Sequence, residues 1–499
     1  MCSTEFKSSL PPAAAATHLV DVYFQYRTPH FPVLDRAEIL ASVQTAYRVF
    51  SNDPATISRS SRRDLFVTFI FFAVSLCGLQ IGSGGRPVES EGCFHSALQY
   101  IDSAIGSSDS DTETLGNILL LAQYISLSPS KGNLWLLSGI ALRICVNIGL
   151  HWETDAALQL EPGHLKKRRR LFWATYNLER LLGVTLGRPF SIEEQSVSVG
   201  YPDAPSPADF HSQLVVNHLL KLSRLESEIK HVLYRHQKRG SLAFPSPDIP
   251  RWMEDIQPRL EEWRASIPPI RDVYHESIYA FSSWWDATFY NTLMLLHRPN
   301  PSIPEPGPDS LRICFDAAKK LIACAQILQR EHQLEMAWIW AQRLFVAGLT
   351  FIYTVWNSVD LRRSNPPEEI VHTAQTCSTT LAVLTGRFPS AAGCRDALET
   401  LVSATVKALF SSQPQAFTGS TEGDTSENSS AGMAILQPDI NLSMESMYSM
   451  LSGDMFGMAQ GVAWSGFSDN ALFDFADQQP TNTEWSVFDE DGQSYNAFM

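Results

Sequence analysis

Cysteine and histidine side chains offer the most specific chemistry in this chain, because thiolates and imidazoles bind zinc and act as nucleophiles or bases. His231 and His236 are five residues apart, which is the wrong spacing for two metal ligands on one helix face. No CxxC pair occurs among the eight cysteines, which stand at positions 2, 77, 93, 145, 314, 324, 377 and 394. The cysteines therefore predict buried free thiols in a reducing compartment, rather than a metal centre or a disulfide framework.

The motifs of common enzyme classes are also missing from the sequence. The chain has no HExxH zinc motif, no GxSxG nucleophile elbow, no GxGxxG fingerprint and no phosphate-binding P-loop. Paired carboxylates occur, as in any chain of this length, but nothing in their spacing places them together. We therefore expect a protein that is not an enzyme, with no catalytic residue and no bound cofactor or metal.

The residues from Lys166 to Arg170 form a run of five basic side chains, the densest in the chain. Such a run can serve as a nuclear localisation signal or can contact phosphate groups. The alternative is a structural role, in which the charges solvate the beginning of a helix and the aliphatic stems pack on neighbours. We favour the structural role, with nuclear import as an additional use and DNA contact as the weakest of the three.

Two amphipathic helices frame this basic run. Over residues 133–148 apolar side chains recur at i, i+3, i+4 and i+7, and Gly149 follows where a left-handed C-cap is expected. His151 lies just beyond this helix end, and we expect it to cap or pack rather than to line a ligand pocket. A second helix is expected over 168–183, because Gly187-Arg188-Pro189 cannot continue it.

Similar patterns along most of the chain predict an all-α fold. Hydrophobic residues make up 44% of the sequence and there are 12 tryptophans, so a large core can form. We expect one large multi-helix regulatory domain over 17–410, preceded by a disordered leader over 1–16. The expected helices lie at roughly 64–81, 91–105, 112–127, 133–148, 168–183, 211–236, 251–265, 278–297, 310–330, 332–358, 367–385 and 391–410.

One segment tests whether a membrane is involved. From Leu65 to Ile81 the chain has 17 uncharged residues, which is the lower limit for a membrane span. Thr68, Ser75, Gly78 and Gln80 weaken that interpretation, and the chain offers no second span. We therefore expect a buried core helix and no membrane partner, with a single span as the less favoured alternative.

The composition of the chain changes near its C-terminal end. From Ala408 to Met499 there are 13 acidic and no basic residues, whereas the preceding 407 residues carry 40 acidic and 38 basic ones. Residues 411–440 read as a linker, and 441–499 as a largely disordered region in which acidic charges keep apolar side chains accessible. This alternation is typical of activation domains that a coactivator groove captures. The expected contact residues are Phe467, Leu472, Phe473, Phe475, Trp485 and Phe488.

Six sequence motifs occur along the chain in the same order as in a known protein family. Four of them are residues 23–35, 65–82, 289–299 and 381–401. The other two, W…GxAxR…GLH and RRRxFW…R…LGRP, are carried by Trp135, Arg143, His151, Arg168, Arg169, Arg170, Phe172, Trp173, Arg180, Gly187, Arg188 and Pro189. Together they resemble the middle homology (regulatory) domain of fungal binuclear zinc-cluster transcription factors. Glu179 stands where this family usually has Asp.

The resemblance implies a fungal transcription regulator of the activator type, located in the nucleus. Its regulatory domain would bind a DNA-bound transcription factor or a second copy, and its tail would recruit transcription machinery or coactivators. For the tryptophans of the helices we favour core packing, with a pocket between facing helices that binds a small-molecule inducer as the alternative. The family's DNA-binding module holds zinc with six closely spaced cysteines. Cys2 is the only cysteine before Cys77, so we expect no zinc in this chain and DNA contact only if that module is supplied.

Two other interpretations remain open at this stage. The sequence could come from a truncated gene model of a complete zinc-cluster DNA-binding transcription factor, in which an upstream exon is missing; transcript reads upstream of Met1 would reveal this. It could also be a helical scaffold or binding protein unrelated to promoters, which a reporter assay with the tail would reveal.

Overall fold

The apolar periodicity of the sequence is realised as helices that follow one another from Ala13 to Ser411. The computed structural model describes residues 9–26, 32–52, 56–78, 87–106, 110–204, 210–234, 248–269, 277–411, 486–488 and 494–496. The predicted all-α class is confirmed. The only strands in the described part of the chain are β1 (Ser486–Phe488) and β2 (Ser494–Asn496), which pair antiparallel.

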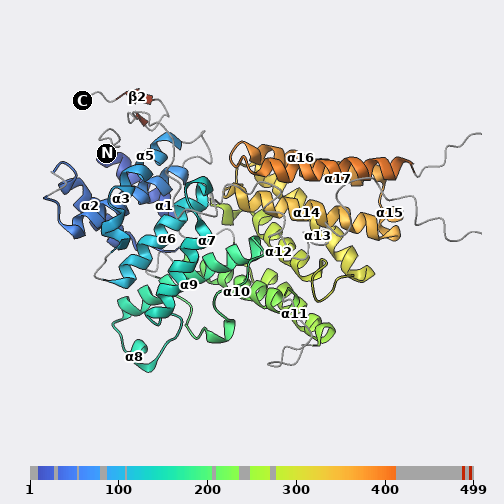
Figure 1. Ribbon diagram of the computed structural model, residues 1–499, viewed down its shortest axis with the longest axis horizontal. Helices are drawn as coiled ribbons and strands as arrows, with labels where there is room; N and C mark the ends of the chain where they lie inside the picture. The colour runs from blue at the N-terminus through green and yellow to red at the C-terminus, as the bar shows by residue number, and fades with distance from the viewer. Residues whose placement is uncertain are drawn as a thin grey trace, which may run out of the picture.

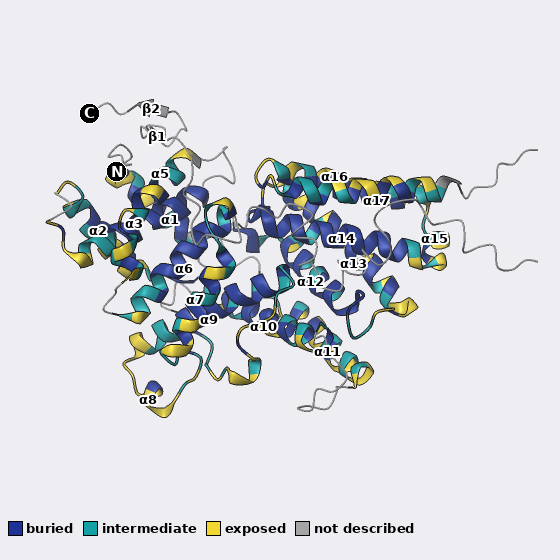
Figure 2. Ribbon diagram, viewed as in Figure 1, coloured by how far each residue is buried: buried dark blue, intermediate teal, exposed yellow. Residues whose placement is uncertain are grey.

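A first group of helices is built around α3, a helix that is buried along most of its length (Figures 1 and 2). The group comprises α1 (Ala13–Tyr26), α2 (Arg36–Val49), α3 (Arg59–Gly78), α5 (Pro87–Leu98), α6 (Asp111–Leu127), α7 (Leu134–Asn147), α8 (Asp155–Leu158) and α9 (Pro162–Thr185). Because α3 packs against α1, α2, α5 and α6, every residue from Leu65 to Cys77 is buried. The predicted core helix is therefore confirmed, and no helix of the described residues has the length and apolarity that crossing a membrane requires.

A second group is built around α14 in the same way. It comprises α10 (Phe210–Leu233), α11 (Ile249–Ala265), α12 (Ser282–His297), α13 (Pro308–Arg330), α14 (Ala337–Asn357), α15 (Val359–Ser364), α16 (Pro367–Thr385) and α17 (Ala391–Ser411). Figure 1 shows α16 and α17 side by side, covering α14. The approach of α17 depends on Gly348, because a Cβ there would lie 2.8 Å from the Leu398 side chain.

The two groups share one hydrophobic core. The α9 and α10 helices pack against each other where the groups meet, and α9 also contacts α14. A hydrogen bond crosses the same boundary: the indole N–H of Trp338 in α14 donates to the carbonyl oxygen of Ser126 in α6, at 2.8 Å. This indole is buried, so its polar atom needs such a partner.

The predicted helix ends agree with the structure at the two glycines. Gly149 and Gly187 have φ angles of +65° and +69°, in the left-handed region that glycine adopts without a Cβ penalty. The predicted starts are less accurate. The α9 helix begins at Pro162, which is pre-organised for the first helical position, so the basic run lies inside the helix rather than at its beginning. The α14 helix begins only at Ala337, after His332 with its φ of +56°.

The prediction of buried free thiols is confirmed for six of the seven described cysteines. All seven are free, and six of them are buried in the core; Cys324 is half-buried. Burial raises the pKa of Cys145, Cys314 and Cys377 to about 12, because a thiolate would have to be desolvated. Cys2 lies outside the described residues.

Candidate functional site

The turn after α9 brings the chain back over its own helix. The left-handed Gly187 reverses the direction, and the residues from Arg188 to Gln195 form a segment that we name the return segment. The ring of Phe190 lies directly on Gly183 of α9, where a Cβ atom would be 2.5 Å from the ring carbon Cε1. Only glycine at this position allows so close an approach.

A buried ion pair of α9 forms hydrogen bonds to the backbone of the return segment. Glu179 and Arg180 of α9 form an ion pair, and each side chain is 1% exposed. The Glu179 carboxylate also accepts the backbone N–H of Ser191 at 2.6 Å, and Arg180 donates to the carbonyl oxygen of Ile192 at 2.8 Å. The Arg180 guanidinium lies 4.2 Å from the centre of the Phe190 ring. The two buried charges thus neutralise each other, and each is also hydrogen-bonded to a backbone group of the segment.

Arg169, in the basic run, forms a bidentate ion pair with Glu153. The two N···O distances are 2.6 and 2.9 Å, and the hydrogen bonds from Arg169 lower the pKa of Glu153. The Arg169 guanidinium also covers Gly200, where a Cβ would lie 2.9 Å from its Cζ atom. The carbonyl oxygen of Gly200 accepts the indole N–H of Trp173 at 2.8 Å. Arg169 and Trp173 therefore attach the chain around Gly200 to α9.

The other basic side chains of the run contact elements far away in sequence. Arg168 donates to the carbonyl oxygen of Gly149 at the end of α7, at 3.0 Å. Lys167 and Arg170 both reach Glu38 of α2, at 2.8 and 3.5 Å. These contacts support the structural interpretation of the run, because the charges join α9 to α2 and α7.

The remaining motif residues have different environments. Arg188 lies over the ring of Trp135, 5.1 Å from its centre, so the return segment also contacts α7. Phe172 is buried in the core. His151 is half-buried after the end of α7, and its backbone carbonyl accepts the N–H of Ser198 at 3.0 Å. Arg143 is exposed on α7.

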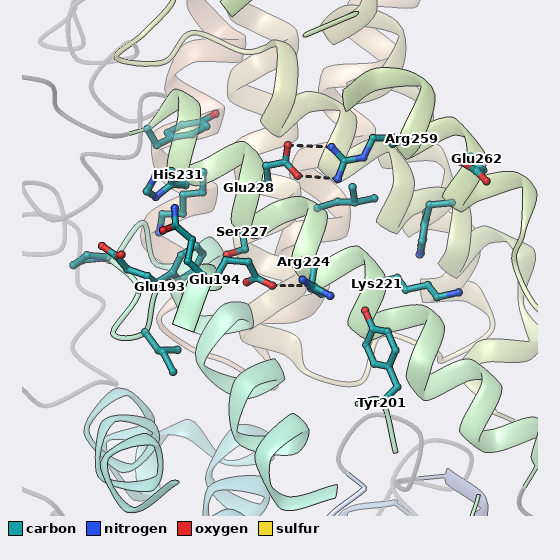
Figure 3. A pocket seen from close by; sticks show the side chains of 18 of the residues that line it. Glu193, Glu194, Tyr201, Lys221, Arg224, Ser227, Glu228, His231, Arg259 and Glu262 are labelled. Carbon is teal, nitrogen blue, oxygen red and sulfur yellow. Dashed lines mark hydrogen bonds and ion pairs between the residues drawn. The ribbon is translucent and has the colours of Figure 1, made fainter. Parts of the chain in front are cut away.

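A groove of about 950 Å³ lies between the return segment, α10 and α11 (Figure 3). Pro189 is the predicted motif residue that lines it. Lys230 of α10 lines it too, and its ammonium group donates to the carbonyl oxygens of Gly183 and Arg188. Burial lowers the pKa of Lys230 to about 7, since the charged form is poorly solvated there.

A second carboxylate, Glu194, connects the groove to the buried ion pair. It accepts the hydroxyl of Tyr176 and the Nε–H of Arg224, each at 2.6 Å, and one of its oxygens lies 3.6 Å from Arg180. On the opposite wall, Arg259 forms a bidentate pair with Glu228, at 2.8 and 3.0 Å. These ion pairs give the groove a polar lining with fixed positions.

The groove residues were not predicted from the sequence. On α10 the polar side chains Lys221 and Arg224 have the spacing of an ordinary solvated helix face, and nothing in it indicates a groove. Only the packing of α11 and of the return segment against α10 encloses them. Within the described residues, no group of three or more metal-ligating side chains comes together.

The predicted activation residues cannot be placed in the same way. Phe467, Leu472, Phe473, Phe475 and Trp485 lie outside the described residues, as does His236. Phe488 is the last residue of β1.

Comparison with known proteins points to one family. The model of the fungal specific transcription factor domain matches residues 20–265, which include the second half of α1, the helices from α2 to α11, the motif residues and most of the groove. The chain is 24% identical to the positive regulator of purine utilization of Emericella nidulans, over 81% of this chain and 48% of that protein. It is 25% identical to pyrimidine pathway regulatory protein 1 of Saccharomyces cerevisiae, over 63% of this chain and 36% of that protein.

A third similar protein is the acetamidase regulatory protein of Aspergillus oryzae, with 23% identity over 72% of this chain and 44% of that protein. The chain therefore spans less than half the length of each of these three relatives. Their names describe regulators rather than enzymes. Residues 20–265 of this chain are therefore a fungal specific transcription factor domain.

Proposed function

We propose that this protein regulates transcription in the nucleus of a fungus, as an activator. The observation that carries the proposal is the match of residues 20–265 to the fungal specific transcription factor domain, in a chain whose similar proteins are named as regulators. Transcription regulators generally act in the nucleus. The helical body over 17–410 would serve as the regulatory part, and the acidic region over 441–499 as the output.

The composition of the tail supports the activating direction. The region over 441–499 has nine acidic residues and no basic ones, and this charge keeps apolar side chains in water, where a coactivator groove can bind them as a short induced helix. The aromatic residues give such a groove its anchors. A tail that only improved solubility would need acidic residues without these aromatics.

Recruitment to a promoter is the second part of the proposal. The body would bind a DNA-bound transcription factor or a second copy of the chain, and would contact DNA itself only through a zinc-cluster module. The ion pairs of Lys167, Arg169 and Arg170 support this assignment, because they use the densest basic run of the chain for contacts inside the domain.

The decisive experiment separates activation from solubilisation. Residues 413–499 are fused to an unrelated DNA-binding domain and reporter output is measured, together with a variant in which Phe467, Phe473, Phe475, Trp485 and Phe488 are changed to Ala. We expect activation by the unchanged tail and a several-fold loss in the variant, which keeps every acidic charge. No activation, combined with a full-length protein that stays in the cytoplasm, would contradict the proposal.

A second measurement tests recruitment. The purified full chain is titrated with genomic DNA fragments at several salt concentrations. Weak binding without sequence preference, which falls steeply with salt, is the expected result. Tight, sequence-selective binding would show that this chain reads DNA without a partner.

A further inference from the structure

Lys230 has an unusual environment for a lysine, because it lines the groove and is nevertheless only partly exposed. Its Nζ atom donates to the carbonyl oxygens of Gly183, in the last turn of α9, and of Arg188, at the start of the return segment. The centre of the Phe190 ring lies 4.8 Å from the same atom. No carboxylate among the described residues forms an ion pair with it. The amine is thus held by backbone and aromatic groups rather than by an opposite charge.

The hydrogen-bond partners of Lys230 match a neutral amine better than an ammonium group. A neutral amine has two N–H bonds and one lone pair, whereas an ammonium group has three N–H bonds and no lone pair. The described residues offer the nitrogen two acceptors, the carbonyl oxygens of Gly183 and Arg188. In the neutral form both N–H groups are therefore bonded and the lone pair stays available. In the charged form the third N–H has no acceptor within the described part of the chain.

The charges near Lys230 also favour the neutral form. Arg180 of α9 and Arg298, which follows α12, are buried cations close to it, and the buried Glu179 carboxylate opposes them. Burial lowers the pKa of Lys230 to about 7; the charge of Glu179 raises it, and those of Arg298 and Arg180 lower it further. The Tyr234 hydroxyl, one turn later on α10, accepts the Nε–H of Arg298 at 2.8 Å and adds no negative charge. A large share of the Lys230 side chains is therefore uncharged at neutral pH.

We propose that Lys230 is a modification site, at which the Nζ atom attacks the carbonyl carbon of an acyl thioester and becomes acylated. The lone pair of the nitrogen forms the new N–C bond, the C–S bond breaks, and the thiolate leaves and takes up the proton that the nitrogen loses. A desolvated lysine beside other cations is the kind that proteins use as a nucleophile. The groove, with its volume of about 950 Å³, gives the thioester a route to this atom and room for the acyl group.

Acylation would change how the return segment is attached to α10. The amide nitrogen keeps a single N–H, so it can donate to only one of the two carbonyl oxygens, of Gly183 or of Arg188. The positive charge at the C-terminal end of α9 is lost as well. We therefore expect the return segment to open more often, although the Glu179–Arg180 pair still bonds to it.

The test measures acetylation of the purified full chain. The protein is incubated at pH 7.5 with S-acetyl-N-acetylcysteamine, a small acetyl thioester, and peptide mass spectrometry gives the rate at each lysine. We expect Lys230 to react at least about tenfold faster than the exposed Lys221 and Lys407, because only a neutral amine is nucleophilic. A rate at Lys230 equal to or below that of these two lysines would overturn the proposal.

The dependence of this rate on pH separates nucleophilicity from accessibility. The rate at Lys230 should rise up to about pH 7 and then level off, whereas the rate of free Nα-acetyl-lysine should keep rising toward the ordinary lysine pKa of about 10.4. In the chain unfolded by urea, Lys230 should follow the free amino acid, because its partners are gone. A rate at Lys230 of the folded protein that rises as that of the free amino acid does would overturn the proposal.

Variants test the effect on the return segment. Lys230→Gln removes the charge as acylation does, whereas Lys230→Arg keeps a cation with several N–H groups. Hydrogen exchange of residues 188–195 should be several-fold faster in Lys230→Gln and in the acetylated protein, and less affected in Lys230→Arg. The matched control is Lys221→Gln, at an exposed position of the same helix. Equal exchange in Lys230→Gln and Lys221→Gln would overturn the expected effect on the segment. A chain that is acetylated at Lys230 but activates no reporter would contradict the proposed function and leave the modification site standing.

Discussion

Arg180 forms an ion pair with Glu179, its neighbour in the chain, at a place where both side chains are 1% exposed. Consecutive residues on a helix normally point in different directions. Here both side chains reach the same return segment, one through the N–H of Ser191 and the other through the carbonyl oxygen of Ile192. The pair therefore fixes the return segment to α9, and we name it the clamp. Arg180, a residue of the family motif, thus has a structural role.

Breaking this clamp should be costly. Arg180→Met leaves the Glu179 carboxylate buried without its cation, and Glu179→Gln leaves the guanidinium with only the more distant Glu194, at 3.6 Å. We expect each change to lower the free energy of unfolding by about 3–5 kcal/mol, and the double variant to lose less than the sum. Urea denaturation followed by circular dichroism measures these values.

The matched control is another pair of neighbouring residues. Arg395 and Asp396 of α17 form an ion pair at 2.6 Å, but on the surface. Arg395→Met should change stability little, because water solvates Asp396 equally well without its partner. If Arg180→Met and Arg395→Met lowered the free energy of unfolding by similar amounts, burial would not explain the effect of the Glu179–Arg180 pair on stability.

Replacing Gly183 by alanine and replacing Gly139 by alanine should change the stability of the protein in opposite directions. Gly183→Ala places a methyl group against the Phe190 ring and should cost about 1–3 kcal/mol through overpacking. A Cβ atom added at Gly139 in α7 would have no heavy atom within 4 Å, so Gly139→Ala should stabilise the protein by about 0.5–1 kcal/mol through helix propensity. Thermal denaturation of both variants checks the difference in sign.

The basic run yields a prediction that separates folding from nuclear import. Arg169→Gln removes the bidentate pair with Glu153, whose side chains are only 17% and 14% exposed. We expect a lower melting temperature of the purified protein, where import plays no part, and a similar loss for Glu153→Gln. If Arg169→Gln leaves the melting temperature unchanged but abolishes nuclear accumulation, the run acts as an import signal and not as a structural element.

Two buried histidines predict how stability depends on pH. Burial lowers the pKa of His218 and of His297 from 6.5 to about 4, with the charge of Lys221 adding to the effect at His218. Between pH 6.5 and about 4 the unfolded chain binds these protons and the folded chain does not, so stability falls as the pH falls through this range. The loss should be on the order of 3 kcal/mol for each histidine.

The variant His218→Phe isolates one of these contributions. The phenyl ring keeps the stacking on Trp263, Nε2 has no partner among the described residues, and the one hydrogen bond lost is that of the imidazole to the Trp263 backbone. Melting temperatures between pH 7 and 4 should therefore fall less steeply than in the unchanged protein. His231→Gln, at an exposed position, serves as the control, and an equal reduction in slope there would contradict the assignment.

The sequence alone determined the helices and where several of them end. The period of the apolar residues is a local property, so the buried α3 and the ends of α7 and α9 at Gly149 and Gly187 could be predicted without knowing any tertiary contact. The start of α9 was harder to predict, because the six residues before Arg168 carry a weak apolar pattern and the helix begins with a proline.

The tertiary structure alone decided what the polar side chains meet. The motif arginines could be identified from the sequence motifs, but their partners come from α2, from the loop after α7 and from the return segment. Lys221 and Arg224 look like a solvated helix face in the sequence, and they line a groove only because α11 and the return segment pack beside α10. Such partners lie tens to hundreds of residues apart, as Trp338 and Ser126 do, and a local pattern carries no information about which distant atoms will approach a given donor.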